Sequence, residues 1–383
     1  MGTTHKKRGS IDLPIGRPVK GVLSSFSPLI AQYIDKYRPS KEGWSAQTIS
    51  VELGLEDSLS DKNKPTVSSI GRYLCSKKRT KRYRKPYHQE PSAFIKTTQA
   101  HEVWQIDAEG TKNILGVGWV SPINVKDIET KIFVVTYPCC VKTVNNLPTT
   151  IDYQWALRVA FMEWGLPRYL QTDHGSVFFD NKSTSPFPTT LYLWLLGLGI
   201  EILFTPVGKP QKQGMVERSH QTLHGQLTPG IALTNFNDLF DFFQQRRQRL
   251  NEHIPSCANQ KLPPLVNRPD ARMPLRAYEI LNEANLFDKN KIHQYLQNQT
   301  WFRLVALNKN FSIGGQIYHL PSAKPNSQIL VKYNKALEGF DCFEPNGKLL
   351  DFCPAKKLNF NELAGDINQF NSWVISRLLL KHD

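Results

Sequence analysis

Three short stretches near the amino terminus carry apolar residues at helical spacing. The first, 27–37, opens with Ser-Pro, the second, 45–53, opens with a capping Ser, and the third, 65–75, opens with Pro-Thr. These features predict a helix-turn-helix module over residues 26–76, whose third helix would enter the major groove of DNA. From the pattern alone, an ordinary three-helix packing unit is an equal alternative.

The pattern changes near residue 100, where apolar runs of strand length begin. HEVWQIDAEG, LGVGWVSPINV and KIFVVTYPCCV predict three strands, and residues 148–164 predict a helix. Strand RYLQTD, helix LYLWLLGLGI, strand EILFTP and helix QGMVERSHQTLHGQL follow, before a long helix at 235–250. This order predicts a mixed α/β core with a mixed sheet over residues 99–254.

The carboxyl-terminal third is predicted as three further segments. Residues 255–295 are expected to be a proline-rich linker and helix. Between 296 and 360, runs such as WFRLVAL, GQIYHL and QILVKYN are separated by Gly, Pro and Asn, which predicts a small β-barrel. Residues 361–383 are expected to form a C-terminal helical tail. The predicted fold class is therefore multidomain α/β.

Positive charge is concentrated in the first quarter of the 383-residue chain. The formal net charge is +15, and residues 1–90 hold 18 Lys and Arg against 8 Asp and Glu. A basic arm beside a nearly neutral body indicates a polyanionic partner, either nucleic acid or an anionic membrane surface. Residues 1–25 are expected to be a flexible basic arm and residues 77–98 a basic linker. Within that linker, the residues expected to contact DNA are Lys77, Lys78, Arg79, Lys81, Arg82, Arg84 and Lys85.

Other classes of protein are disfavoured by what the sequence lacks. No apolar run reaches the ~20 residues that cross a bilayer, and the first residues have no apolar segment typical of a signal peptide. The six cysteines form no CxxC pair, so we expect reduced thiols and no structural zinc. We therefore expect an intracellular, cytoplasmic location.

Three acidic residues occupy special positions in the predicted core. Asp107 lies near the end of the first strand, Asp173 ends the fourth, and Glu217 lies in the first turns of a helix. Carboxylates from two strand ends and one packed helix can converge, and bound cations would relieve their repulsion. Hard oxygen ligands suit Mg²⁺ or Mn²⁺, and two such ions can support an in-line displacement at phosphorus. We therefore expect the three carboxylates to be both metal ligands and catalytic residues.

The residues around these acids favour a phosphodiester substrate. Asp173 is followed by His-Gly-Ser, small and polar residues that let a large substrate approach the backbone. A basic loop precedes Glu217, and its residues expected to contact DNA are Lys209, Gln211, Lys212 and Gln213, with Arg218 just beyond.

The motifs WQID, QTDHGSVF and GKPQKQGMVERSHQTL resemble the catalytic core of the DDE transposase and retroviral integrase superfamily. The flanking modules resemble those of bacterial insertion-sequence transposases, which implies a nucleoid-associated protein of a bacterial cell. The resemblance covers roughly residues 26–360 and implies an RNase H-like core. It also implies Asp107, Asp173 and Glu217 as ligands of two Mg²⁺ or Mn²⁺ ions. The implied reaction is 3′-end cleavage of the element by water, followed by attack of the new 3′-hydroxyl on target DNA. The implied partners are double-stranded DNA and further copies of the chain. An accessory ATPase is left open.

Several features depart from the family pattern. His174 stands where Asn is commoner, Gln213 replaces a frequent Asn, and 43 residues separate Asp173 from Glu217, which fits an insertion around NKSTSPFP. No paired His and Cys occur before residue 100, so the zinc module of retroviral integrases is absent.

Alternatives remain for individual residues and for the whole chain. Glu109 is a fallback ligand, although a solvent-facing turn position is expected, and His220 and His224 are expected at the surface or on DNA. The rival functions are a catalytically inactive DNA-binding regulator with the same fold and an RNase H-like nuclease that only hydrolyses.

Overall fold

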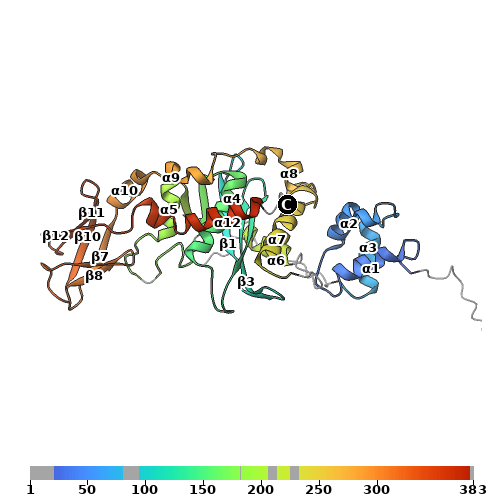
Figure 1. The fold of residues 1–383 in the computed structure, drawn as a ribbon, viewed down its shortest axis with the longest axis horizontal. Helices are drawn as coiled ribbons and strands as arrows, with labels where there is room; N and C mark the ends of the chain where they lie inside the picture. Colours follow the sequence, from blue (N-terminus) through green and yellow to red (C-terminus); the bar gives the residue numbers. More distant parts are fainter. Residues whose placement is uncertain (1–20, 81–94, 182, 206–213, 225–232, 380–383) are drawn as a thin grey trace, which may run out of the picture. The chain divides into compact units, whose positions relative to one another are not determined.

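The computed structural model describes residues 21–80, 95–181, 183–205, 214–224 and 233–379 (Figure 1). These residues form two compact units, one from the amino-terminal helices and one from the rest of the chain. Among the described residues, none of the helices combines the length and the apolar character that a bilayer crossing requires.

The amino-terminal unit is built from three helices, as the hydrophobic spacing predicted. They are α1 (Pro28–Tyr37), α2 (Ala46–Leu55) and α3 (Val67–Ser76), with a 3₁₀ turn at Asp57–Leu59 between the last two. The side chains of Ser27, Ser45 and Thr66 cap them by accepting backbone N–H bonds, which satisfies donors that a helix start leaves unpaired. Their shared core is apolar and fully buried, and includes Ile30, Ile34, Ile49, Leu53 and Ile70.

The second unit is organised around a six-stranded mixed sheet, which confirms the predicted α/β core. Its path is β2-β3-β1-β5-β6, with β4 on the other side of β3. Strands β1, β5 and β6 run parallel, whereas β3 pairs antiparallel with β1, β2 and β4. The strands are β1 (Val103–Ala108), β2 (Lys112–Ile114), β3 (Gly118–Asp127), β4 (Phe133–Cys140), β5 (Tyr169–Thr172) and β6 (Glu201–Phe204).

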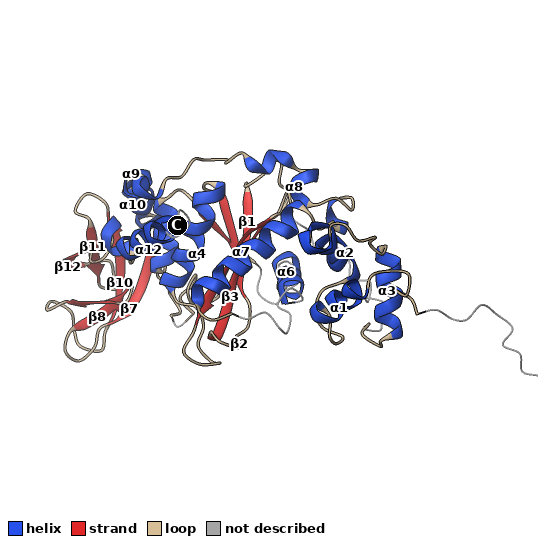
Figure 2. Cartoon of the chain, turned by 45° about the vertical axis from the view of Figure 1, so that its right-hand side comes forward, coloured by secondary structure: helices blue, strands red, loops and turns tan. Residues whose placement is uncertain are grey.

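Helices cover both faces of this sheet. Successive residues of a strand point to opposite faces, so the adjacent Trp104 and Gln105 of β1 show what lies on each side. On one face, the Trp104 ring stacks 6.0 Å from Phe161 of α4. On the other, the adjacent Gln105 bonds to the backbone of α6. Helices α4 and α7 both pack against β4. Figure 2 shows these two helices beside strands of the same sheet. These helices are α4 (Thr150–Trp164), α5 (Thr190–Gly197), α6 (Gly214–His224) and α7 (Phe236–Glu252).

The segment 255–295, predicted as a proline-rich linker and helix, folds back onto the core. It contains α8 (Pro264–Asn267), α9 (Glu283–Leu286) and the start of α10 (Lys289–Gln297). A fully buried ion pair joins it to α4, with Arg158 NH2 2.8 Å from Glu283 Oε1. The indole of Trp194 also donates to Glu283 Oε1 at 3.0 Å. The segment is therefore part of the core's packing.

The carboxyl-terminal strands form an open sheet instead of the small closed barrel that the sequence predicted. A four-stranded antiparallel sheet has the order β12-β11-β10-β7, and β8 and β9 form a separate hairpin. The sheet does not close because β7 meets the core along its other side: Phe302 N donates to Ser185 Oγ at 3.1 Å and Trp301 Nε1 to Pro186 O at 3.1 Å. The strands are β7 (Thr300–Leu304), β8 (Asn310–Ile313), β9 (Gln316–His319), β10 (Gln328–Asn334), β11 (Gly339–Phe343) and β12 (Leu349–Pro354).

The insertion after Asp173 thus connects the core to the carboxyl-terminal sheet by packing against it. Phe187 lies 4.9 Å from the Trp301 ring and 6.0 Å from Phe340, measured between centroids. The extra residues that lengthen the spacing between Asp173 and Glu217 therefore have a packing role.

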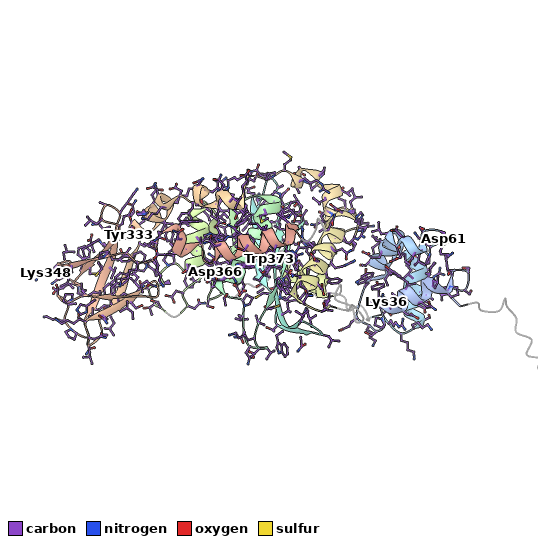
Figure 3. The ribbon with its side chains drawn as sticks, in the orientation of Figure 1. Lys36, Asp61, Tyr333, Lys348, Asp366 and Trp373 are labelled. Carbon is purple, nitrogen blue, oxygen red and sulfur yellow. The ribbon has the colours of Figure 1, made fainter. Side chains whose placement is uncertain are left out.

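The chain ends in α11 (Phe360–Leu363) and α12 (Ile367–Leu379). Helix α12 crosses α4 (Figure 1), and Trp373, labelled in Figure 3, packs 5.6 Å from Trp155 and 5.2 Å from Phe240. The predicted helical tail is therefore present, and it covers α4 and α7.

Candidate active site

The three predicted carboxylates lie on three elements that meet. Asp107 is the penultimate residue of β1, Asp173 directly follows the neighbouring parallel strand β5, and Glu217 is in the first turn of α6. In the register of the two strands, Gln105 stands opposite Gln171, so the two aspartates leave their strands at the same level. Helix α6 packs against both β1 and β3.

A buried glutamine pair fixes these three elements to one another. Gln105 Nε2 donates to Gln171 Oε1 at 2.7 Å, and Gln105 Oε1 accepts from the backbone N–H of Val216 at 3.3 Å. Each of these residues lies one or two positions before a predicted ligand. One side chain thus links the backbone segments that carry all three carboxylates.

The turn after β5 holds Asp173 by local hydrogen bonds. The backbone N–H of Gly175 donates to Asp173 Oδ1 at 2.8 Å, and Asn181 Nδ2 donates to His174 O at 2.6 Å. The His174 ring stacks on Phe204 of β6, with centroids 4.8 Å apart. The His that departs from the family pattern therefore packs on the sheet, and Asp173 is left exposed.

The pKa of Asp107 depends on the charges of the other two acids. Its pKa is raised to about 7, first by burial, then by the negative charges of Asp173 and, more weakly, Glu217, while a hydrogen bond from Ala108 N opposes the shift. About a quarter of its side chain (26%) is exposed, whereas Asp173 and Glu217 are exposed. Negative charge is therefore concentrated at one point that a cation can reach.

Glu109, expected in a solvent-facing turn, is instead largely buried, with 12% of its side chain exposed. The backbone of Glu109 is still bonded to β3, through its N–H to Pro122 O at 2.7 Å. Its side chain forms an ion pair with Lys112. Its carboxylate also contributes to the raised pKa of Asp107, although less than the other two acids.

His220 likewise differs from its expected surface position. Its side chain is 14% exposed, and Nδ1 lies 4.0 Å from Asp107 Oδ2. Burial, and then the positive charge of Lys112, lowers the pKa of His220 to about 4, so the ring is neutral at physiological pH. It is buried because α6 turns this face toward β1 and β3. The side chain of His224 lies outside the described residues.

The residues predicted to contact DNA are only partly described. Lys77 and Lys78 are exposed after α3, whereas Arg79 pairs with Asp35 of α1. Arg218 is exposed on α6 next to Glu217, and its charge, after burial and Lys131, contributes to lowering the pKa of Lys126 to about 8. The residues Lys81, Arg82, Arg84, Lys85, Lys209, Gln211, Lys212 and Gln213 lie outside the described part of the chain.

The donor set suits a hard divalent cation by its chemistry. In the ranges that the structure describes, no three His, Cys, Asp or Glu side chains are close enough together to hold a metal ion as they stand. The carboxylates nonetheless sense one another's charge, and oxygen donors of this kind are those that Mg²⁺ and Mn²⁺ prefer.

Sequence reasoning missed the polar residues behind the acids. Gln105, Gln171 and Asn124 are buried within strands, at 2%, 5% and 1% exposure. An available signal was that each interrupts an otherwise apolar run, in VWQID, YLQTD and SPINV. A buried polar side chain needs partners, so such an interruption marks a place where elements meet.

Comparisons with known proteins found solved structures to which the chain is similar. No protein-family model matches the sequence. The chain is similar to the HTLV-2 integrase catalytic core domain in complex with magnesium, at 14% identity and a TM-score of 0.32, over 45% of this chain and 98% of that one. It is also similar to the simian T-cell lymphotropic virus intasome in complex with PP2A regulatory subunit B56 gamma, at 13% identity and a TM-score of 0.35, over 76% and 93%. Retroviral integrases are thus among the proteins that the chain is similar to.

Proposed function

We propose that this chain is a DDE-type DNA transposase or integrase that cuts the ends of a DNA element and joins them to target DNA. The observation that carries the proposal is that β1, β5 and α6, the elements of Asp107, Asp173 and Glu217, meet at the buried Gln105. In agreement with this geometry, burial and then the charges of Asp173 and Glu217 raise the pKa of Asp107. Asp173 and Glu217 lie 66 and 110 positions after Asp107 in the sequence, yet the three acids share one electrostatic site. The hydrogen bonds of Gln105 hold that site together. Clusters of like charge that burial makes unfavourable are typical of functional sites.

Asp107, Asp173 and Glu217 are proposed to hold two Mg²⁺ or Mn²⁺ ions. When bound, such ions supply Lewis-acid stabilisation of charge at a phosphate and on the attacking and leaving oxygens. Arg218, exposed beside Glu217, is proposed to bind a phosphate of the DNA backbone. His220 is neutral and adds no positive charge that would compete with a cation beside Asp107.

The proposed chemistry is two successive in-line displacements at phosphorus. Water attacks the phosphate at the element end, the bond to the 3′ oxygen breaks, and that oxygen leaves as a 3′-hydroxyl. This hydroxyl then attacks a phosphate of the target strand. The bond from that phosphate to the target strand's own 3′ oxygen breaks, and that oxygen leaves as a hydroxyl. Neither step requires a covalent bond to the protein, because each nucleophile is water or the DNA itself.

The flanking units are proposed to bind DNA and further subunits. The three-helix unit would recognise the element ends, with the exposed Lys77 and Lys78 on the phosphate backbone. The open carboxyl-terminal sheet would bind DNA or a neighbouring copy. Two element ends must be held together for joining, so a homo-multimer on DNA is part of the proposal. An accessory ATPase is not part of the proposal.

The test is a strand-transfer assay with DNA from the flanks of the protein's own gene, in Mg²⁺ or EDTA, with sequencing of joined products. The wild type should join ends only with Mg²⁺, and Asp173→Asn and Glu217→Gln should abolish joining but keep DNA binding. Glu201→Gln, which alters an exposed carboxylate of β6, is the matched control and should join normally.

Other outcomes distinguish the rival functions. End-specific binding with no cutting by the wild type would favour a DNA-binding regulator. Cutting of hybrids without joining would favour a nuclease. Joining by either the Asp173 or the Glu217 variant would remove that residue from the mechanism.

A further inference from the structure

A row of three polar side chains crosses the sheet at the candidate site. Asp107 of β1 pairs in register with Asn124 of β3, and Asn124 pairs with Thr136 of β4. Directly opposed residues of antiparallel strands point to the same face, with Cβ atoms ~5 Å apart. This face is the one on which Gln105, two residues before Asp107, bonds to α6. The row therefore starts at Asp107, the most buried of the three acids, and lies on the face of the sheet that α6 covers.

The polar atoms of this row are buried without partners. Asn124 is 1% exposed and Thr136 is fully buried. In the part of the chain that the structure describes, neither Asn124 Nδ2, Asn124 Oδ1 nor Thr136 Oγ1 has a hydrogen-bond partner. His220 Nε2, whose ring lies beside Asp107, is also buried without one. Burying such groups unpaired is unfavourable, and in a native protein it calls for an explanation.

Other buried asparagines of this unit show how unusual Asn124 is. Asn251 of α7 accepts from Phe133 N at 2.8 Å and donates to Phe133 O at 2.9 Å, so its amide is used at both ends. Asn259 donates to Thr130 O at 3.3 Å. These two side chains hold elements together, whereas Asn124 makes no such bond and stands next to Asp107.

We infer that Asn124 is a positioning residue for Asp107, and that its amide Nδ2 donates to the Asp107 carboxylate when that carboxylate binds a cation. In the described state, Asp107 Oδ1 already accepts from Ala108 N at 2.9 Å, and a carboxylate has further acceptor positions free. The inference rests on the proposed function, since it assigns a partner to one of the proposed ligands. Carboxylates that bind metal ions are themselves commonly hydrogen-bonded, and these partners tune affinity.

Thr136 completes the arrangement. Thr136 is opposed to Asn124 in register, so the two side chains lie on the same face of the sheet with Cβ atoms ~5 Å apart. A Thr136 hydroxyl that donates to Asn124 Oδ1 would orient the amide so that its N–H₂ faces Asp107. A donor chain from Thr136 through Asn124 to Asp107 would use atoms that are otherwise unpaired in the described structure.

The test compares Asn124→Leu, which removes the amide at similar volume, with Asn251→Leu, which removes an amide that only bonds to backbone. The primary readout is Mg²⁺ binding by the full chain without DNA, measured as the rise in melting temperature during a Mg²⁺ titration. Asn124→Leu should melt in EDTA at the wild-type temperature or above it, yet bind Mg²⁺ about 10–100-fold more weakly. Asn251→Leu should melt lower in EDTA and bind Mg²⁺ as the wild type does.

A second variant covers the case in which Asn124→Leu does not fold. Thr136→Val keeps the shape of the side chain and removes the hydroxyl, and it should weaken Mg²⁺ binding several-fold. The inference is overturned if the wild type binds Mg²⁺ and joins DNA while the foldable variants of this row match it in Mg²⁺ affinity. A wild type that neither binds Mg²⁺ nor joins DNA would overturn the proposed function itself.

Discussion

Gln105 and Gln171 share a buried hydrogen bond of 2.7 Å across the parallel strands β1 and β5, two residues before Asp107 and Asp173. The same Gln105 accepts from Val216 N, immediately before Glu217. The alignment of the three acids therefore depends on one amide that touches no proposed substrate.

Replacing Gln105 with Leu should reduce strand transfer more than it reduces stability. The change leaves Gln171 Oε1 and Val216 N without this partner, which should lower the free energy of unfolding by about 1–3 kcal/mol. Because the support of the three carboxylates is lost, strand transfer in Mg²⁺ should fall by about 10–100-fold. Urea unfolding and a strand-transfer assay measure the two effects.

Gln154→Leu is the matched control for this substitution. Gln154 of α4 is equally buried, and its Nε2 donates to Leu363 O at 2.7 Å, a bond that involves none of the three acids. It should lose stability and retain strand transfer. Equal losses of activity in the two variants would show that Gln105 has only a general packing role.

Asp107→Asn should stabilise the metal-free protein and remove its response to Mg²⁺. The pKa of Asp107 is raised to about 7, so the folded state holds this proton more tightly than the unfolded chain does. Ionising the group therefore costs stability as pH rises from about 4 through 7. In EDTA the variant should melt about 2 °C or more above the wild type at pH 8, and the difference should shrink toward pH 5. Scanning calorimetry at both pH values, with and without Mg²⁺, checks the sign. A variant that melts lower at pH 8 would contradict the repulsion described here.

Removal of residues 1–86 should abolish end-specific binding while the core still folds. The amino-terminal helices form a compact unit with their own core, and the rest of the chain forms another. In the full chain, Lys77→Ala with Lys78→Ala should weaken DNA binding for all sequences and reduce the salt slope by about one per lysine. Footprinting and a salt titration measure these effects. An unchanged footprint after the deletion would refute the recognition role.

Much of the fold could be predicted because the hydrophobic periods of the chain agree with its elements. The strand carrying WQID, the helix at 148–164 and the three amino-terminal helices all follow from local spacing. The barrel prediction was wrong because alternation within strands does not specify what the sheet edge meets. Here β7 meets Ser185 and Pro186, more than a hundred residues earlier in the chain.

The candidate site, like the fold, could be predicted only in part from the sequence. The three acids could be proposed from their strand-end and helix-start positions, together with the resemblance of their motifs. The burial of Glu109 and His220 could not. It depends on how α6 packs on β1 and β3, and on the pairing of Glu109 with Pro122 of β3 and with Lys112 of β2. The partners of Gln105 depend equally on the register of β1 and β5, which no local pattern gives.

The central claim is that Asp107, Asp173 and Glu217 together hold two divalent ions, and anomalous scattering from Mn²⁺ in crystals of the protein with DNA tests it most directly. The account predicts two peaks about 3.5–4 Å apart, with Asp107 contacting both and Asp173 and Glu217 each contacting at least one. Peaks elsewhere, or a site in which any of the three carboxylates is out of reach of the ions, would contradict it.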